Sequence, residues 1–406
     1  MRCGGSMKAI KDPVHGYINV ESSLLPLLDT PEVQRLRYIR QLGFSFLVYP
    51  GAHHTRFEHS LGTMHLAKTL SRGLDLPGYE QVLVTSAALL HDIGHGPFSH
   101  AIETLSREIL GRQHTDVLDR LSGGDLGPVL EKAGVNPEEV FRLIDGTHPL
   151  SGIIHGDLDV DRMDYLLRDA HYTGVPYGTV DATRLIRSMN LSGRKIILDE
   201  SGIQAAESLL IARTLMRSSV YYHHVSRIAE KMFTLAVHEY IRPDPPDILP
   251  GMLLLDDAAC MQTLLHAENP VVSRLSKDLY RRHLYKRALY VGKEQVREVA
   301  SLTSESFPEE RKFAEEIART AGVHPSDVLV DIPGFPRDIW MEVQVKGRSS
   351  LLPLEKVSPL VTTLNETRRS QWRLGVYAPE PLVDVVSQAA RSVLNIRPYT
   401  RQEHLV

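Results

Sequence analysis

The sequence predicts a mostly α-helical protein with a smaller α/β region at its C-terminal end. Apolar residues recur with helical periodicity to about residue 240. A proline-rich segment, 242–247, then interrupts the pattern, because three prolines within four positions cannot continue a helix. Beyond about residue 321, short β-branched runs alternate with helical ones. These three observations predict a helical core at 7–241, a helical extension at 247–321 and an α/β region at 322–406.

The helices of the core have recognisable ends. Thr30 and Pro31 follow Asp29, which places a side-chain cap and a first-turn proline at the start of the first helix. Gly94 follows the helix expected to end at Ile93, where a C-terminal glycine belongs. The predicted helices are 30–42, 58–72, 82–93, 101–110, 115–121 and 204–240.

Strands are predicted at fewer places. A short strand pair is expected at 195–199, inside the helical core. In the C-terminal region the strand candidates are 328–332, 339–345 and 373–377, followed by a closing helix at 382–393.

The composition indicates an ordinary globular chain. It has 406 residues, of which 42% are hydrophobic and 24% charged. Its apolar runs are shorter than the roughly 18 residues that span a bilayer, and its start lacks a secretory profile, so a cytoplasmic location without membrane contact is predicted. Cys3 and Cys260 are too few for a disulfide framework or a thiolate metal site. A net charge of −4 does not favour nucleic acid as a partner.

The most informative stretch is HDIGHGPFSH, residues 91–100. His91 and Asp92 end an apolar helical run, where their desolvation is costly unless a cation compensates it. His59 in TRFEHSLG and Asp161 in DLDVDRMDYLLRD complete a set of two imidazoles and two carboxylates. Such a set suits a divalent ion that activates water for phosphoester hydrolysis. The sequence therefore predicts one divalent metal ion: Mg, Mn, Fe, Ni or Zn.

The order H…HD…D, with all three motifs intact, resembles the HD-domain metal-dependent phosphohydrolases. The similarity is to the deoxynucleoside triphosphate triphosphohydrolase branch, which includes the vertebrate SAM-and-HD-domain enzyme and shorter bacterial and archaeal relatives. It runs from about Lys8 to about Met232 and thins out beyond, and no SAM domain is expected before it. The resemblance implies an HD-domain helical core and the metal ligands His59, His91, Asp92 and Asp161.

The resemblance also implies catalytic residues near the metal. His95 matches a histidine that contacts substrate phosphates, and His114 matches one thought to act as general acid. The other interpretation of His114 is a solvent-exposed histidine at a helix N-terminus. His100 and Glu103 match a histidine–carboxylate pair, in which the carboxylate orients the imidazole and raises its basicity.

The helix after Val160 is informative by its spacing. Asp161, Tyr165 and Asp169 lie at i, i+4 and i+8 and share one face, which predicts a substrate wall beside a metal ligand. Asp164 and Arg168 are expected to form an ordinary i, i+4 ion pair, worth a few tenths of a kcal/mol.

By resemblance, this wall belongs to a nucleotide pocket. Tyr165 and Asp169 would contact the sugar, and three arginines would neutralise the polyphosphate, one of which, Arg162, replaces a family lysine. The alternative for Arg213 and Tyr221 is a solvated arginine and a core tyrosine. The substrate-binding residues so implied are Gln41, Arg56, Arg162, Tyr165, Asp169, Arg213 and Tyr221.

A second constellation lies upstream. Asp29, Gln34 and Arg37 match the family positions of a guanine-nucleotide regulatory site built between subunits, and Lys8 matches a phosphate contact there. The resemblance thus implies a guanine nucleotide activator and a homo-oligomer, either dimer or tetramer. The other interpretation is an N-cap aspartate followed by a solvated helix face.

The expected reaction is hydrolysis of a deoxynucleoside triphosphate to deoxynucleoside and tripolyphosphate. A phosphomonoesterase on the same metal site is an alternative, although it needs fewer cations than the three arginines supply. A cyclic dinucleotide phosphodiesterase fits less well, because that branch carries lysine where His95 stands and a later GYP motif. A non-catalytic nucleotide sensor is the third alternative, against which the intact ligand set argues.

Overall fold

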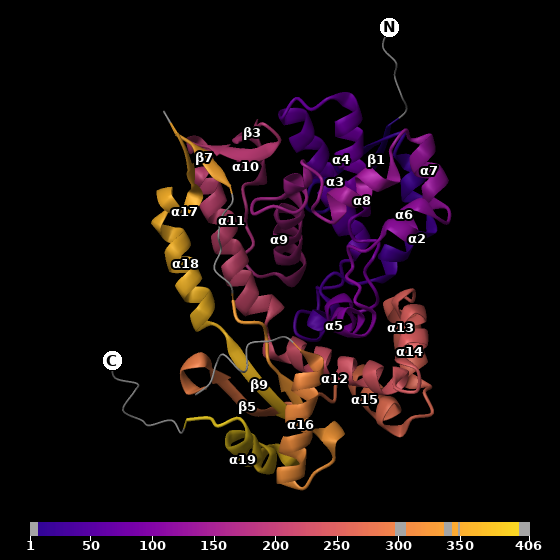
Figure 1. Cartoon of the computed structure of the whole chain (residues 1–406), viewed down its shortest axis with the longest axis vertical. Helices are drawn as coiled ribbons and strands as arrows, with labels where there is room; N and C mark the ends of the chain where they lie inside the picture. Colours follow the sequence, from indigo (N-terminus) through magenta and orange to yellow (C-terminus); the bar gives the residue numbers. More distant parts are fainter. Residues whose placement is uncertain (1–6, 297–305, 337–342, 348–349, 398–406) are drawn as a thin grey trace. The chain divides into compact units, whose positions relative to one another are not determined.

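A computed structural model describes residues 7–296, 306–336, 343–347 and 350–397. The described chain is mostly α-helical with a few small sheets, which confirms the predicted fold class (Figure 1). It divides into two compact units, the first within 1–99, 112–221 and 339–364 and the second within 100–111, 222–338 and 365–406. The predicted division into three consecutive regions stays a prediction.

The first unit contains the HD motifs. Its helices are α1 (Leu25–Leu28), α2 (Pro31–Arg35), α3 (Arg56–Gly73), α4 (Gly78–Leu90), α6 (Leu118–Ser122), α7 (Leu126–Lys132), α8 (Pro137–Ile144), α9 (Val160–Thr173), α10 (Ala182–Arg187), α11 (Ile203–Met216) and α17 (Leu354–Val357). Residues of α18 (Pro359–Ser370) belong to both units.

Two small sheets complete the first unit. Strands β1 (Met7–Asp12) and β2 (Gly16–Glu21) form an antiparallel hairpin. The other sheet has the order β3-β4-β7-β8, built from β3 (Met189–Ser192), β4 (Lys195–Asp199), β7 (Gln344–Lys346) and β8 (Leu351–Pro353). A strand pair was predicted at 195–199; β4 occupies that range, and its partner β3 precedes it. Of the predicted strand 339–345, positions 339–342 lie outside the described residues.

Three helix ends in the first unit carry the predicted ligands. Thr55 and Glu58 form a capping box at the start of α3, where the Thr55 amide donates to Glu58 Oε2 at 2.6 Å. Helix α4 is apolar and buried over its last eight residues and ends at Leu90. Asp159 caps α9 by accepting from the Arg162 amide at 2.7 Å. Each end is thus fixed within a few residues of a predicted metal ligand.

The second unit combines helices with a three-stranded sheet. Its helices are α5 (Ser99–Leu110), α12 (His224–Ile241), α13 (Pro245–Leu253), α14 (Asp257–Leu265), α15 (Pro270–Tyr280), α16 (Phe307–Ala321) and α19 (Val383–Val393). The antiparallel sheet has the order β5-β9-β6, from β5 (Lys286–Gly292), β9 (Arg373–Ala378) and β6 (Leu329–Asp331). The predicted strands 328–332 and 373–377, the closing helix and the break at 242–247 are confirmed.

Several predicted boundaries are wrong. The helix expected at 30–42 is the five-residue α2 followed by a 3-10 turn, Leu36–Tyr38, because Ile39 is extended and Arg40 forms a β-bridge with Thr55. The helix expected at 204–240 is α11 and α12, separated by the π-helical turn Arg217–Tyr221. Strand β5 lies where a helix was expected, because its pairing with β9 decides its conformation.

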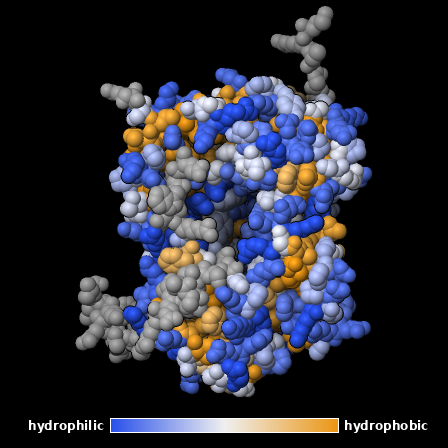
Figure 2. Space-filling view, in the orientation of Figure 1, coloured by the Kyte–Doolittle hydropathy of each residue, from blue (hydrophilic) through white to orange (hydrophobic). Residues whose placement is uncertain are grey.

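The surface is mixed in character. Hydrophilic side chains predominate on the face in Figure 2, and hydrophobic ones form scattered patches. Among the described residues, none of the helices combines the length and apolar character that crossing a membrane requires.

Candidate metal centre

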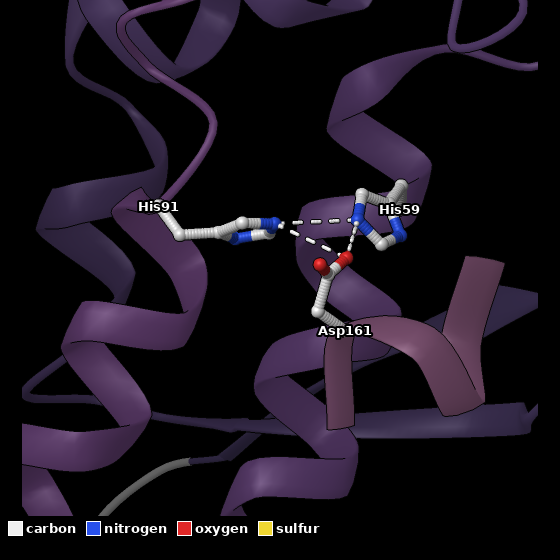
Figure 3. A group of neighbouring side chains, drawn as sticks. All are labelled: His59, His91 and Asp161. Carbon is white, nitrogen blue, oxygen red and sulfur yellow. Dashed lines mark hydrogen bonds and ion pairs between the residues drawn. The ribbon is translucent and has the colours of Figure 1, made fainter. Parts of the chain in front are cut away.

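Three predicted ligands converge in the first unit (Figure 3). His59 comes from α3, His91 directly follows α4, and Asp161 lies in the first turn of α9. Asp161 Oδ1 lies 2.9 Å from His59 Nε2 and 3.7 Å from His91 Nε2. The two Nε2 atoms are 3.3 Å apart. The three side chains therefore surround one position with their ligand atoms.

The outer nitrogens of both imidazoles fix which atoms face that position. His91 Nδ1 lies 2.8 Å from the Ala88 carbonyl oxygen, which can only accept, so Nδ1 donates. His59 Nδ1 lies 2.8 Å from Asp164 Oδ2. In the neutral form that metal ligation requires, each ring presents an Nε2 lone pair to the shared position. Two buried lone pairs facing each other beside a carboxylate fit a divalent cation, which His59, His91 and Asp161 could hold.

Asp92 borders the same position. Its Oδ1 is 3.4 Å from His91 Nε2, and its Oδ2 is 3.9 Å from His59 Nε2. Arg56 Nη1 donates to Asp92 Oδ2 at 2.7 Å, and Arg56 Nε donates to Ser99 Oγ at 2.7 Å. Burial raises the pKa of Asp92, but the Arg56 charge together with His91 and His95 outweighs it and holds this pKa well below its usual value.

Arg56 is thus a partner of Asp92, while its predicted contact with the polyphosphate stays a prediction. It is buried, at 2% exposure, and its guanidinium holds a candidate metal ligand in the ionised form.

Asp164 supports His59 from behind. Its Oδ2 accepts from His59 Nδ1 and from Arg168 Nε at 2.9 Å, and its Oδ1 accepts from Arg168 Nη2 at 2.9 Å. The side chains of Asp164 and Arg168 have no exposed surface. The predicted ion pair forms, but its ordinary surface character is wrong, because breaking a buried pair costs about 3 to 5 kcal/mol.

The loop from His91 to His95 is held by its carbonyl groups. Arg35 Nη2 donates to the His95 carbonyl at 2.6 Å, and Arg120 Nη1 donates to the Ile93 carbonyl at 2.5 Å. A Cβ at Gly94 would lie 1.8 Å from the His114 carbonyl oxygen. The prediction that Gly94 ends a helix is wrong: α4 ends four residues earlier, and this close approach is what requires glycine.

Two of the predicted catalytic residues meet within the first unit. The rings of His95 and His114 stack with centroids 4.1 Å apart, and His95 Nε2 lies 3.3 Å from Asp92 Oδ1. Burial, with the charge of Arg56, holds the pKa of His95 well below its usual value, so its imidazole is neutral near pH 7. His100 and Glu103 lie on α5 in the second unit, and their role stays a prediction.

The predicted sugar contacts are linked through a residue that the sequence analysis missed. Asp169 accepts from Tyr221 Oη and from His54 Nε2, both at 2.8 Å, and is 1% exposed. The Gln41 amide donates to the His54 carbonyl at 3.0 Å, and Gln41 Oε1 is buried without a partner among the described residues. His54 lies just before the RFEHS motif in the sequence, and this proximity could have indicated that it belongs to the site.

Cationic and aromatic groups lie beside Asp161 on α9. The Tyr165 ring is 6.1 Å from that of Tyr221, and burial raises the pKa of Tyr165 to about 12 against the opposing charges of Arg213 and Arg162. Arg162 donates to Asp159 and to the Gly156 carbonyl, so its charge is already paired.

A second unpredicted histidine lies in the same region. Burial and the nearby His91 lower the pKa of His155 to about 4. Its Nε2 is buried and makes no hydrogen bond to any described residue.

The predicted regulatory residues lie on β1 and around α2. Lys8 and Asp29 are exposed. Gln34 donates to the Leu28 carbonyl at 2.5 Å and accepts from Arg37 Nε at 2.8 Å. The alternative of an N-cap aspartate is wrong, because Thr30 is the N-cap of α2 and Asp29 follows the end of α1.

Comparison with protein families matches most of the chain. Residues 56–169 match the HD domain, and residues 180–405 match the HD associated region. The second match corrects the expectation that family similarity thins out beyond Met232.

Individual relatives agree. The uncharacterized protein MJ1154 of Methanocaldococcus jannaschii is 35% identical, over 92% of this chain and 80% of its own length. Human SAMHD1, named a deoxynucleoside triphosphate triphosphohydrolase, is 31% identical over 58% of this chain but 45% of its own length.

A solved structure extends the match to the fold. A hypothetical protein from Aquifex aeolicus superposes with a TM-score of 0.75 at 29% identity, covering 95% of this chain and all of that one. The HD associated region alone matches more than half of the sequence, and the HD domain that precedes it contains the histidine–aspartate centre. The chain therefore belongs to the HD-domain family of phosphohydrolases.

Proposed function

We propose that this chain hydrolyses deoxynucleoside triphosphates to deoxynucleoside and tripolyphosphate at the centre formed by His59, His91, Asp92 and Asp161. A divalent ion held there would act as a Lewis acid on a phosphoryl oxygen and lower the pKa of a bound water. SAMHD1, a relative by sequence, is named for this reaction.

The chain's own side chains have distinct roles in this proposal. Arg56 keeps Asp92 ionised, and Asp164 keeps the His59 Nε2 lone pair directed at the centre. His114, whose ring stacks on that of the neutral His95, would pass a proton to the departing 5′-oxygen. Tyr165, Asp169 and Tyr221 would bound the sugar.

Arg213 carries the argument for a polyphosphate substrate. It is half-buried, close to Arg162 and Tyr165, and makes no ion pair or hydrogen bond with any described residue. Burial and the Arg162 charge lower its pKa although Asp159 and Asp157 oppose them, and neither carboxylate forms an ion pair with it that would supply direct negative charge. A polyphosphate would supply that charge through charge-assisted hydrogen bonds.

The products provide the test. Incubation of each deoxynucleoside triphosphate with Mg²⁺, Mn²⁺, Co²⁺, Ni²⁺ or Zn²⁺ is expected to yield deoxynucleoside and tripolyphosphate in equal amounts, measured by anion-exchange chromatography. Orthophosphate as the sole inorganic product would support a phosphomonoesterase instead. Absence of hydrolysis with every metal would support the alternative of a non-catalytic nucleotide sensor.

The same assay tests the role of Arg213. The Arg213→Gln variant should lose about 10- to 100-fold in kcat/KM for the triphosphate, the value of one or two charge-assisted contacts. Arg184→Gln, at an exposed arginine of α10, is the matched control and should retain wild-type kinetics. Equal kinetics for the two variants would remove Arg213 from the substrate site.

We also propose that a guanine nucleotide activates the chain through Lys8, Asp29, Gln34 and Arg37 and shifts it toward a higher oligomer. Arg35 supports a path to the centre, since it lies next to Gln34 and donates to the His95 carbonyl. The activator must bind one assembly state better than another.

The expected result is that GTP or dGTP increases both hydrolysis and sedimentation coefficient. Asp29→Ala should abolish both responses and leave metal binding unchanged. Activity and assembly that do not depend on the nucleotide would contradict this regulation.

A further inference from the structure

The turn of the N-terminal hairpin reaches the support of the metal centre. Strand β1 ends at Asp12 and β2 begins at Gly16, whose φ of +75° favours glycine. Asp12 Oδ1 accepts from the amides of Val14 at 2.9 Å and His15 at 2.8 Å, which fixes the turn. Asp12 Oδ2 accepts from Arg168 Nη1 at 2.8 Å, which ties the turn to α9.

His15 leaves this turn toward Asp164. Its Nε2 lies 2.6 Å from Asp164 Oδ1, and its side chain is 8% exposed. Arg168 Nε and Nη2 also donate to this carboxylate, each at 2.9 Å, so Asp164 is the acceptor of the hydrogen bond with His15.

The Asp164 carboxylate is thereby saturated. It has about four lone-pair positions, and four donors occupy them: Arg168 Nε, Arg168 Nη2, His59 Nδ1 and His15 Nε2. Two oxygens held by four directed bonds cannot rotate without losing one of them. The orientation of His59, which depends on Oδ2, therefore depends on what holds Oδ1.

We propose that His15 is a positioning residue of the metal centre, which acts through Asp164 to direct His59 Nε2 at the ion. The hairpin β1–β2 then contributes to metal affinity although it supplies no ligand. The inference rests on the metal centre of the proposed function and not on its substrate.

The test is a titration with Co²⁺ alone, followed by its visible absorption, which reports both affinity and ligand geometry. His15→Ala is expected to bind Co²⁺ about 10- to 100-fold more weakly, the usual cost of removing a group behind a metal ligand. His15→Gln can place an amide donor near Asp164 Oδ1 and should recover most of the affinity and the spectrum. His15→Met fills similar space without a donor and should behave like His15→Ala.

His65→Ala is the matched control. The His65 ring packs 5.4 Å from that of His15, and no hydrogen bond joins it to Asp164 within the described chain. It should keep wild-type Co²⁺ affinity, with folding of every variant checked by circular dichroism. Should His15→Ala not fold, the comparison of His15→Met with His15→Gln replaces it.

Wild-type affinity and spectrum in folded His15→Ala or His15→Met would overturn the inference. An equal loss in His65→Ala would overturn it as well, because it would show a general packing effect. Since no nucleotide is present, a failure of the triphosphohydrolase proposal would not affect the result.

Discussion

Replacing Asp161 or His91 with alanine is expected to abolish both divalent-metal binding and phosphoester hydrolysis while leaving the helical core folded. Each variant removes one of the three ligand atoms that converge in the first unit. Removing a group behind a ligand already costs about 10- to 100-fold in affinity, so removing a ligand should cost more than about 100-fold. Elemental analysis of the purified variants measures the occupancy directly.

The control is Asp181→Asn, an exposed N-cap of α10 that asparagine also fills well. It should keep wild-type metal content and thermal unfolding. Wild-type occupancy in Asp161→Ala or His91→Ala would reject the ligand assignment.

A single methyl group at Gly62 is expected to be strongly destabilising. The added Cβ would lie 1.8 Å from Asp164 Oδ1 and 2.4 Å from Arg168 Nη2. Both groups belong to a buried ion pair that cannot move without breaking its bonds to His59 and Asp12. The Gly62→Ala variant should lose about 3 to 5 kcal/mol in free energy of unfolding, measured by urea denaturation.

Gly73→Ala provides the comparison within the same helix. Gly73 is exposed at the end of α3, and nothing lies within 4 Å of its added Cβ. Its stability should be unchanged or higher by up to about 1 kcal/mol, because alanine is the better helix former. Equal stabilities for the two variants would show that α9 adjusts to α3 at little cost.

The ligand residues could be predicted from sequence because their chemistry is local. His91 and Asp92 follow an apolar helix, and Asp161 follows a capped helix start. A short sequence motif therefore shows both the ligand side chain and its position at a helix end. Helices α3 and α4, predicted at 58–72 and 82–93, were placed to within a few residues of their observed bounds, Arg56–Gly73 and Gly78–Leu90.

The groups behind the ligands could not be predicted in the same way. Asp164 and Arg168 have the spacing of a surface pair, and nothing in that spacing reveals that Gly62 and the hairpin bury them. Arg56 was given a polyphosphate contact by resemblance, and its ion pair with Asp92 was not predicted, because the two residues lie far apart in sequence. Strand β5 was missed for a related reason, since its partner β9 lies more than 80 residues later.

The hydrogen bonds of the hairpin turn also have a consequence for biosynthesis. They join His15 to Asp164 and Asp12 to Arg168, across 149 and 156 residues of sequence. At about 5 to 20 residues per second, a ribosome needs roughly 8 to 30 s to extend the chain from the hairpin to α9. During that interval His59 lacks the carboxylate that orients it, and closing so long a loop slows folding further. Metal loading should therefore follow the folding of the first unit rather than guide it.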